Sequence, residues 1–456
     1  MRKSAGNKKK STAFTLITLL LLILCGAGAY VFLVYFEGEQ PQIKLARELE
    51  YFARNNTVKF SASDQKSGLK RLVVTLSQGG KSKVLLDETV PRRVQGEPPQ
   101  SAKNFELDIK PKQLGFKEGE AALIIEAEDH SFRSFPSGNK TTLTSQVVID
   151  TEAPKINILH GERYINPGGS GIFIYQINGE PVELGLELNG RVNPGFPTGD
   201  NHVYISYFGL PFNSKNFPPA FIFARDKAGN IGRTPVSSTF KAVNFKHDQI
   251  RVPDSFLSRK VPEFRQYYPE LTGSLLEQYL QINNEIRKKN NNDISAVCQK
   301  TMPERLWKGA FLRMPGKPMA GFADHRTYLH NGKKIDKQVH LGQDIASTKH
   351  APVKAANHGK VVYADYLGIY GNMIMLDHGQ GVFSLYSHLS QINVALGDMV
   401  EQGFVIGQTG LTGMAGGDHL HFSMLVNGVF VTPKEWLDKN WVTVTIEEPL
   451  IDSRFQ

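Results

Sequence analysis

The sequence predicts a mainly β protein with an N-terminal transmembrane helix, two β-sandwich modules, a short helical linker and a C-terminal antiparallel β domain. Three observations predict it. An uncharged apolar run extends from Ala13 to Phe36, short alternating apolar segments bounded by turn residues fill most of the chain, and one stretch after Val252 has helical periodicity. With 456 residues the chain is also too long for one ordinary domain.

The N-terminus has the composition of a membrane anchor. As a helix, residues 13–36 would extend about 36 Å, which exceeds the roughly 30 Å of bilayer hydrocarbon. Residues 1–12 carry several basic and no acidic side chains, so they are predicted to be a cytoplasmic basic segment. The sequence therefore predicts a single-pass protein of the cell membrane whose part after Glu37 is periplasmic or otherwise extracytoplasmic.

Two other N-terminal signals are alternatives to an uncleaved anchor. Ala27-Gly28-Ala29 resembles the cleavage site of a removable signal, but the apolar run continues to Phe36 and favours an anchor. Cys25 is a weak lipid-attachment site because Leu24 precedes it where a small residue is usual. Cys298 is the only other cysteine, so the exported part cannot close an internal disulfide.

Two segments after the anchor have the texture of β domains. Residues 37–151 include the strand candidates "LKRLVVTL" and "AALIIEAED", and residues 152–251 include "GIFIYQING", "HVYISYFGL" and "AFIFARDKAGN". The segments end alike, in "IIEAEDHSF" and "IFARDKAGN", which indicates related tandem modules. They resemble bacterial immunoglobulin-like domains, and this resemblance implies spacing or binding. The net charge of +9 falls partly on residues 1–12, and no nucleic-acid-binding signature is present.

Residues 252–301 are predicted to be a helical linker. Leu271, Leu275, Tyr279 and Ile282 recur near helical spacing, which predicts a face that packs on a neighbour. The polar run "RKKNNND" that follows is predicted to be a solvated loop.

Residues 302–445 return to short strands separated by glycine, such as "GKVVYADYL", "GNMIMLDHG" and "GVFSLYSHLS", before a C-terminal tail at 446–456. Nine of the thirteen histidines lie between His325 and His421. This clustering is the strongest chemical signal in the sequence.

Histidines and one aspartate have the spacing of a metal site. His340 and Asp344 lie four residues apart at a predicted strand end and turn, and His419 and His421 share one face of a strand. Together with one of the latter pair, His340 and Asp344 make three protein ligands and leave a fourth position for water, as in catalytic zinc sites. The near absence of cysteine disfavours a closed structural zinc site. His388, in "SLYSHLS", is a candidate non-ligand histidine.

In this order "HLGQDIA", "LYSHLS", "GQTGLTG" and "GGDHLHFSMLVNG" resemble the lysostaphin/LytM-type zinc endopeptidases, which cleave peptidoglycan cross-bridges. The resemblance extends from about Trp307 to Trp436. It implies a metallopeptidase domain in which His340, Asp344 and His421 bind one Zn²⁺. His388 and His419 would position and deprotonate the attacking water and stabilise the oxyanion.

The resemblance implies a membrane-anchored zinc metalloendopeptidase whose partners are peptidoglycan stem peptides, the membrane through the N-terminal helix, and envelope proteins as regulators. The alternative is a catalytically silent envelope scaffold or an activator of partner cell-wall amidases. All five metal and catalytic positions are filled, which favours the enzyme. A secreted bacteriocin-like glycyl-glycine peptidase is disfavoured by the anchor. By position, Leu275 to Ile286 or the second β module is a candidate cover for the active-site groove.

Further residues near the motifs have weaker signals. His358 and His378 precede glycines and are predicted to lie in turns or at the surface. Four further residues are candidates for the cleft: His325, His330, Tyr370 and Tyr386, the last at least equally compatible with a core position. Arg326, in "GFADHRTY", resembles the family's phenylalanine-glycine-x-arginine entry strand. In this stretch, Ala323 occupies the position at which the lysostaphin/LytM-type family usually has glycine.

Overall fold

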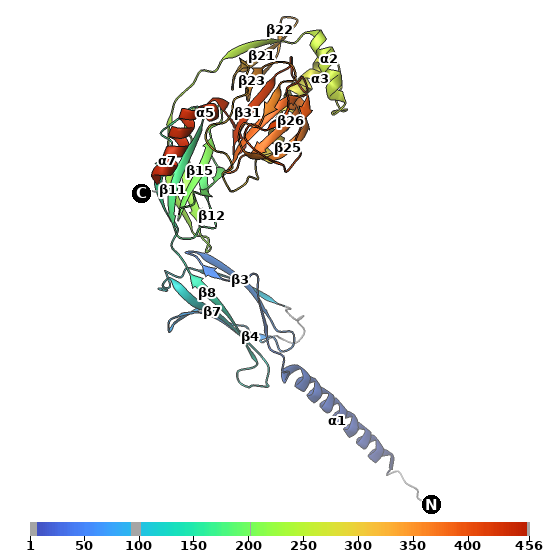
Figure 1. The fold of residues 1–456 in the computed structure, drawn as a ribbon. Coiled ribbons are helices and arrows are strands. Elements are labelled where there is room, and N and C mark those ends of the chain that lie inside the picture. Colours follow the sequence, from blue (N-terminus) through green and yellow to red (C-terminus); the bar gives the residue numbers. More distant parts are fainter. Residues whose placement is uncertain (1–6, 93–101, 201, 454–456) are drawn as a thin grey trace, which may run out of the picture. The chain divides into compact units, whose positions relative to one another are not determined.

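The computed structural model describes residues 7–92, 102–200 and 202–453 and is mainly β with an N-terminal helix, as predicted (Figure 1). The chain forms two compact units. One comprises Met1–Ala153 with Lys227–Asn230, and the other comprises Pro154–Asp226 with Ile231–Gln456. The second β segment, the helical segment and the C-terminal β domain therefore belong to one unit.

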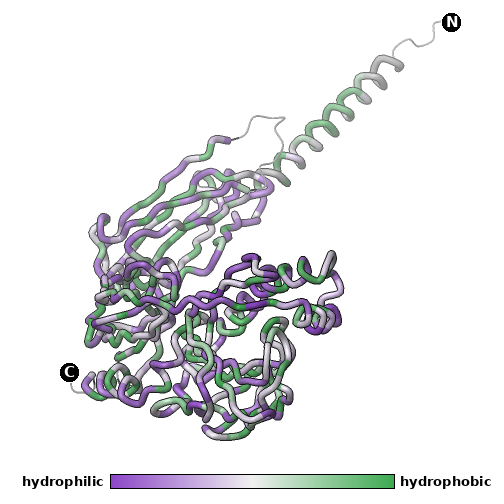
Figure 2. Tube along the Cα trace, turned by 90° about the horizontal axis from the view of Figure 1, so that it is seen from above, coloured by the Kyte–Doolittle hydropathy of each residue, from purple (hydrophilic) through white to green (hydrophobic). Residues whose placement is uncertain are grey.

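Helix α1 (Asn7–Tyr35) contains the predicted apolar segment except for Phe36. Ala13–Leu33, 21 residues, is long and apolar enough to cross a membrane and is not buried within the structure. Its leucines are exposed, and the hydrophobic colour of Figure 2 runs along the helix. A helix that is apolar all round needs an apolar environment, so α1 is suited to be a membrane span or a signal sequence.

The first unit holds two β-sheets over one core. The three-stranded sheet has the order β1-β3-β6 and the five-stranded sheet the order β2-β8-β7-β4-β5. The strands are β1 (Gln42–Leu45), β2 (Tyr51–Phe52), β3 (Asn56–Ser63), β4 (Leu69–Gln78), β5 (Lys81–Thr89), β6 (Lys103–Ile109), β7 (Gly119–Asp129) and β8 (Lys140–Ile149). In β4 and β7 every second side chain is buried, as alternation along a half-covered strand requires. Both strands were predicted.

The second unit begins with two four-stranded sheets, β14-β15-β11-β9 and β13-β12-β16-β17, and the pair β10-β18. The strands are β9 (Lys155–Gly161), β10 (Tyr164–Ile165), β11 (Ser170–Asn178), β12 (Glu183–Leu188), β13 (Arg191–Pro194), β14 (Phe196–Pro197), β15 (Val203–Gly209), β16 (Ala220–Arg225), β17 (Ile231–Val236) and β18 (Thr239–Phe240). Strands β11, β15 and β16 coincide with the three predicted strands. Nearly every residue of β11 and β15 is buried, so their sheet is covered on both faces.

The C-terminal domain is built on a sheet of order β20-β23-β31-β27-β26-β25-β29, with β32 added to β31. Smaller sheets have the orders β24-β30-β28 and β19-β21-β22. The strands are β19 (His247–Arg251), β20 (Lys317–Ala320), β21 (His325–His330), β22 (Lys333–Val339), β23 (Gln343–Ala346), β24 (Pro352–Lys354), β25 (Gly359–Leu367), β26 (Gly371–Asp377), β27 (Val382–Leu389), β28 (Gln391–Ile392), β29 (Met399–Val400), β30 (Val405–Gln408), β31 (Leu420–Val426) and β32 (Val429–Val431). Helical turns α5 (Pro433–Leu437), α6 (Lys439–Val442), η3 (Thr443–Glu447) and α7 (Glu448–Asp452) follow, and η2 (Gly368–Tyr370) links β25 to β26.

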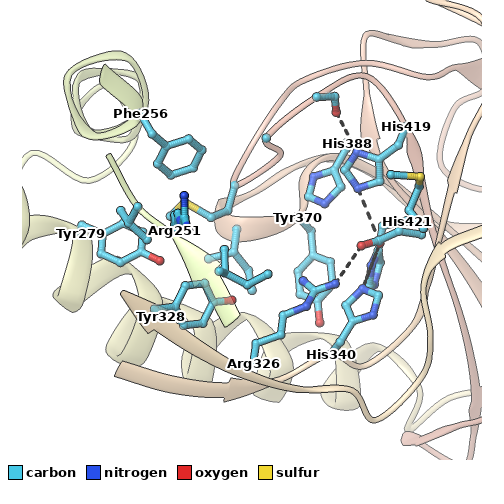
Figure 3. A pocket seen from close by; sticks show the side chains of 18 of the residues that line it. Arg251, Phe256, Tyr279, Arg326, Tyr328, His340, Tyr370, His388, His419 and His421 are labelled. Carbon is cyan, nitrogen blue, oxygen red and sulfur yellow. Dashed lines mark hydrogen bonds and ion pairs between the residues drawn. The ribbon is translucent and has the colours of Figure 1, made fainter. Parts of the chain in front are cut away.

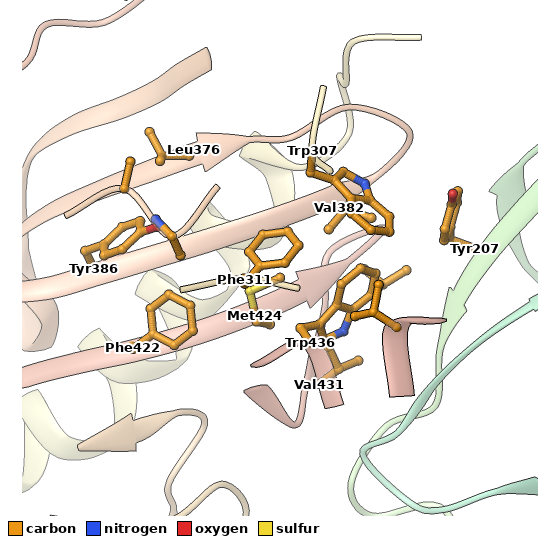
Figure 4. Packing of buried hydrophobic residues seen from close by; sticks show 14 of the residues in the cluster. Tyr207, Trp307, Phe311, Leu376, Val382, Tyr386, Phe422, Met424, Val431 and Trp436 are labelled. Atoms are coloured by element: carbon orange, nitrogen blue, oxygen red, sulfur yellow. The ribbon is translucent and has the colours of Figure 1, made fainter. Parts of the chain in front are cut away.

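One face of this sheet shares a core with the preceding β segment. Tyr207 of β15 lies edge-on to Trp307, with ring centroids 6.3 Å apart, in the cluster drawn in Figure 4. The Trp436 indole also donates to the Ser170 hydroxyl at 3.0 Å. Since the ring contact is apolar and the hydrogen bond is buried, both stabilise the β segment and the C-terminal domain together.

The helical segment covers another part of the domain. It consists of α2 (Asp254–Arg265), α3 (Leu275–Gln281), η1 (Ile282–Ile286) and α4 (Arg287–Val297), and a capping box of Ser274 and Glu277 starts α3. Tyr279 and Ile282 are buried in one cluster with β-strand residues such as Met375 and Leu385. The predicted packing face is confirmed.

The prediction of a solvated loop at "RKKNNND" is wrong, because these residues lie in α4. Polar side chains there make buried contacts. The Asn290 carboxamide oxygen accepts from the Ile369 N–H at 3.0 Å, and Asn291 accepts from the Tyr370 hydroxyl at 2.8 Å. Composition alone did not reveal these partners.

A glutamate at the junction of the β segment and α5 makes stability depend on pH. The Glu435 carboxylate accepts from the Ser170 N–H at 2.7 Å. Burial nevertheless raises the pKa of Glu435 to about 8. Because the pKa of Glu435 is higher in the folded than in the unfolded chain, the protonated carboxyl stabilises the fold at a pH below the pKa of the unfolded chain. This contribution is lost as pH rises toward 8.

We therefore expect Glu435→Gln to be more stable than the native chain at pH 9, by roughly 1–3 kcal/mol, with little difference near pH 4. Glutamine keeps the acceptor for Ser170 but has no charge to desolvate. Urea unfolding of the full chain across this pH range measures the difference, with the exposed Glu448→Gln on α7 as control. Parallel pH profiles for the native chain and Glu435→Gln would contradict the assignment.

Candidate metal centre and active-site cleft

Strand pairing brings the predicted site residues together from distant parts of the sequence. Asp344 in β23 lies directly opposite His421 in β31, and Ser387 in β27 lies opposite His421 on the other side. His388 follows Ser387, and His340 follows the end of β22. The register of three neighbouring strands thus builds the site.

Three donor atoms converge on one point. His340 Nε2, Asp344 Oδ1 and His421 Nδ1 lie 2.9 Å from one another in each pairing. All three residues are buried, and they form a group whose geometry can hold a metal ion (Figure 3).

The outer hydrogen bonds of the two imidazoles set their tautomers. His340 Nδ1 lies 2.7 Å from the Gly321 carbonyl oxygen, to which it can only donate. His421 Nε2 lies 3.0 Å from Ser423 Oγ, whose hydroxyl donates to the Leu341 carbonyl at 2.8 Å. Both N–H groups are therefore used on the outside, and the two inner nitrogens present lone pairs to Asp344. Such a convergence of lone pairs fits a bound cation, and two histidines with one carboxylate suit Zn²⁺.

Asp344 is held as a carboxylate. Burial acts to raise its pKa, but the interactions with His340, His419 and His421 outweigh burial and hold that pKa well below its usual value. The Arg326 guanidinium also contacts Asp344 Oδ2 at 2.9 Å. One oxygen therefore faces the histidines while the other is fixed by Arg326.

His388 and His419 lie beside this group, with ring centroids 4.9 Å apart. His388 Nδ1 lies 2.9 Å from the Thr412 carbonyl oxygen, and His419 Nδ1 lies 2.7 Å from that of Gly417. These bonds leave Nε2 of each ring for the cleft. Burial, then the charges of His419 and His421, lower the pKa of His388. For His419 the bond to Asp344 outweighs burial and raises the pKa.

Gly342 makes room for His421. A Cβ at this position would lie 2.6 Å from His421 Cε1 and Nε2 and from Ser423 Oγ. We expect Gly342→Ala to displace the imidazole and weaken zinc affinity by about 10–100-fold, the usual effect of disturbing a ligand's support. Competition with a chromophoric chelator measures it. Gly416→Ala, where a Cβ meets nothing within 4 Å, is the matched control. Equal affinities for both variants would contradict this role.

Ala323 occupies a conformation that favours glycine. Its φ is +61°, and its N–H donates to the His340 carbonyl at 2.7 Å. A left-handed alanine costs about 1–2 kcal/mol. The departure from the family pattern noted in the sequence therefore affects backbone strain beside His340 and leaves the donor atoms in place.

The weaker sequence candidates fall in different places. Arg326 and Tyr370 line the cleft, whereas Tyr386 lies in the core with its hydroxyl accepting from the Ala356 N–H at 2.7 Å. His358 lies half-buried in a bend. His378 begins the turn between β26 and β27, as expected, but a surface position is wrong for its side chain, which is fully buried and bonded to the His358 carbonyl and the Ser384 hydroxyl.

Neither His325 nor His330 is part of the cleft lining that the structure describes. His325 stacks on His247 with ring centroids 4.9 Å apart, and His330 Nδ1 lies 2.8 Å from the Val252 carbonyl oxygen. Both side chains hold β19 and the start of α2 in place.

Sequence reasoning missed the supports of the site and one wall of the cleft. Ser423 shares a strand face with His421, so the alternation in "HLHFS" was a usable signal for it. The cleft has a volume of about 690 Å³, and residues of β19, α2 and α3 line it. No local pattern connects those residues with the histidine motifs.

Residues 338–433 match peptidase family M23. The chain is 41% identical over 96 residues to the DD-carboxypeptidase/endopeptidase Mpg of Neisseria meningitidis, a match that covers 21% of this chain and 22% of that protein. It is 33% identical over 133 residues to the peptidoglycan DD-endopeptidase ShyC of Vibrio cholerae, covering 28% and 30%. A crystal structure of a putative peptidase M23 from Pseudomonas aeruginosa is 21% identical, covers 60% of this chain and 94% of that one, and has a TM-score of 0.38. The matches thus span under a third of each of these two curated relatives.

Proposed function

Because residues 338–433 form a domain of peptidase family M23, we propose that this chain is a zinc metalloendopeptidase that hydrolyses the peptide cross-bridges of bacterial peptidoglycan. The observation that carries the proposal is the convergence of His340, Asp344 and His421, with His388 and His419 beside them. A catalytically silent scaffold would not require all five of these side chains.

In this proposal His340 Nε2, Asp344 Oδ1 and His421 Nδ1 hold the zinc ion. Zinc, when bound, polarises the scissile carbonyl and makes water nucleophilic at neutral pH. His388 and His419 each direct Nε2 toward the cleft, where one accepts the proton of the attacking water and the other donates to the developing oxyanion. Thr412 and Gly417 fix the ring orientations through their carbonyl groups.

The substrate class follows from the relatives. Mpg is described as a DD-carboxypeptidase/endopeptidase and ShyC as a peptidoglycan DD-endopeptidase. We take the D-alanyl to diaminoacid cross-link as the bond cleaved here. We further propose that α1 is an uncleaved anchor with a cytoplasmic N-terminus, which places the peptidase domain outside the cytoplasm.

The test uses the full chain in detergent, loaded with zinc, on purified sacculi. Mass spectrometry of the released muropeptides should show cleaved cross-links, which disappear when the zinc is chelated and return when it is restored. A chain that binds zinc and releases nothing would refute the enzyme and favour a scaffold or an activator of partner amidases.

A further inference from the structure

The cleft continues beyond the metal centre to an end that is rich in arginine and aromatic side chains. Arg251, Arg259 and Arg287 line it together with Tyr279 and Tyr328. We call these five residues the arginine wall. Figure 3 shows Arg251, Tyr279 and Tyr328 on the side of the cavity away from His388, His419 and His421, with both tyrosine hydroxyls directed into the cavity.

All five residues of this wall lie outside residues 338–433. Strand β19 pairs in parallel with β21, which sets Arg251 opposite Leu329 and Ile250 opposite Tyr328. Helix α2 begins at Asp254 directly after β19 and carries Arg259, while Arg287 starts α4. The wall therefore belongs to the segment that precedes residues 338–433, the part of the chain that matches the peptidase family.

The arginine wall has an excess of positive charge. Within the part of the chain that the structure describes, no acidic side chain forms an ion pair with Arg251, Arg259 or Arg287. Arg287 instead donates to the Asn283 carbonyl oxygen at 3.1 Å and to Asn283 Oδ1 at 2.6 Å. The carboxylates that line the cleft are Asp344 and Asp418. Both are engaged elsewhere: Asp344 with Arg326, and Asp418 with the Thr409 hydroxyl at 2.6 Å. The positive charges of the three guanidinium groups are thus not neutralised by these carboxylates, and the Arg251 and Arg259 guanidinium groups are available to an anionic ligand.

The tyrosines add neutral donors. Tyr279 and Tyr328 pack edge-on with ring centroids 6.3 Å apart. Burial raises the pKa of the Tyr279 hydroxyl, which keeps its proton. Guanidinium forks and neutral hydroxyl donors together suit a carboxylate, which accepts several hydrogen bonds at once.

We infer that the arginine wall binds a free carboxylate of the stem peptide whose cross-link is cleaved at the metal centre. This inference rests on the proposed function. Stem peptides are acidic because their γ-linked glutamate retains a free α-carboxylate, and amidation of that group removes the charge. The wall would therefore make the chain selective for non-amidated peptidoglycan.

The test compares two synthetic cross-linked stem peptides, one with free carboxylates and one amidated, in titration calorimetry with the full chain carrying His388→Ala. We expect the free form to bind at least about tenfold more tightly, with a preference that shrinks as salt rises. Arg251→Gln/Arg259→Gln should lose the preference. Lys288→Gln/Lys289→Gln, which removes two exposed charges from α4 away from the cleft lining, should keep it.

The outcomes separate this inference from the proposed function. If the native chain cleaves sacculi but the two peptides bind equally, the inference is wrong and the function stands. If sacculi resist cleavage while the arginine-dependent preference persists, the binding site stands and the proposed activity falls. Circular dichroism of each variant shows that a lost preference does not reflect unfolding.

Discussion

Replacing Asp344 with asparagine should empty the metal site and abolish cross-bridge hydrolysis. Asp344 Oδ1 lies 2.9 Å from both donor nitrogens and supplies the only negative charge among the three donors. Asparagine has nearly the same shape but no charge, so the fold should persist. We expect zinc affinity to fall more than about 100-fold, beyond the effect of disturbing a supporting group, and hydrolysis to become undetectable. Zinc content after dialysis and muropeptide release measure the two effects.

Asp418→Asn is the matched control for this substitution. Asp418 also lines the cleft, but its carboxylate bonds to the Thr409 hydroxyl and the His350 N–H at 2.6 and 3.2 Å. The control should retain zinc and cleave sacculi. If Asp344→Asn kept zinc at the native level, the proposed ligand set would be incorrect.

The strands around the site could be predicted because each leaves a local pattern. β25, β26, β27 and β31 are short apolar runs bounded by glycine, and β4 and β7 alternate between buried and half-buried side chains. The first motif was predicted to be a strand end followed by a turn, and His340 does follow β22 while Asp344 lies in β23. In these elements local preference and tertiary structure agree.

Contacts between distant segments left no such pattern. That Asp344 faces His421 depends on the register between β23 and β31, which neither strand encodes alone. His378 precedes a glycine, as many turn residues do, yet Ser384 and the His358 carbonyl satisfy both of its nitrogens in the core. The composition of α4 predicts solvated asparagines, but Asn290 and Asn291 accept hydrogen bonds from residues of η2. A polar residue is buried when its partner is present, and the partner lies elsewhere in the sequence.

The same reasoning applies to the segments upstream of the metal centre. The helical segment was expected to be a linker with a packing face, and its packing is confirmed. Its additional role as a cleft wall arises because Phe256, Tyr279 and Arg287 come from separate helices that meet only in the folded chain. By its position in the sequence, part of this segment, Leu275 to Ile286, is a candidate cover for the active-site groove. The structure shows a lined cleft of about 690 Å³ at this place, which favours a binding wall.

His388→Gln and His419→Gln should each leave zinc bound and reduce hydrolysis by about 10²–10⁴-fold, the usual contribution of general acid–base groups. Neither ring supplies a donor atom to the group of His340, Asp344 and His421, so metal content should stay near one ion per chain. The double variant should lose little more than the stronger single variant, because both histidines act in one proton-transfer sequence. Zinc content and initial rates on sacculi measure these effects, with the exposed His350→Gln as control. Unchanged rates in either single variant would remove that histidine from the mechanism, whereas loss of zinc would make it a ligand.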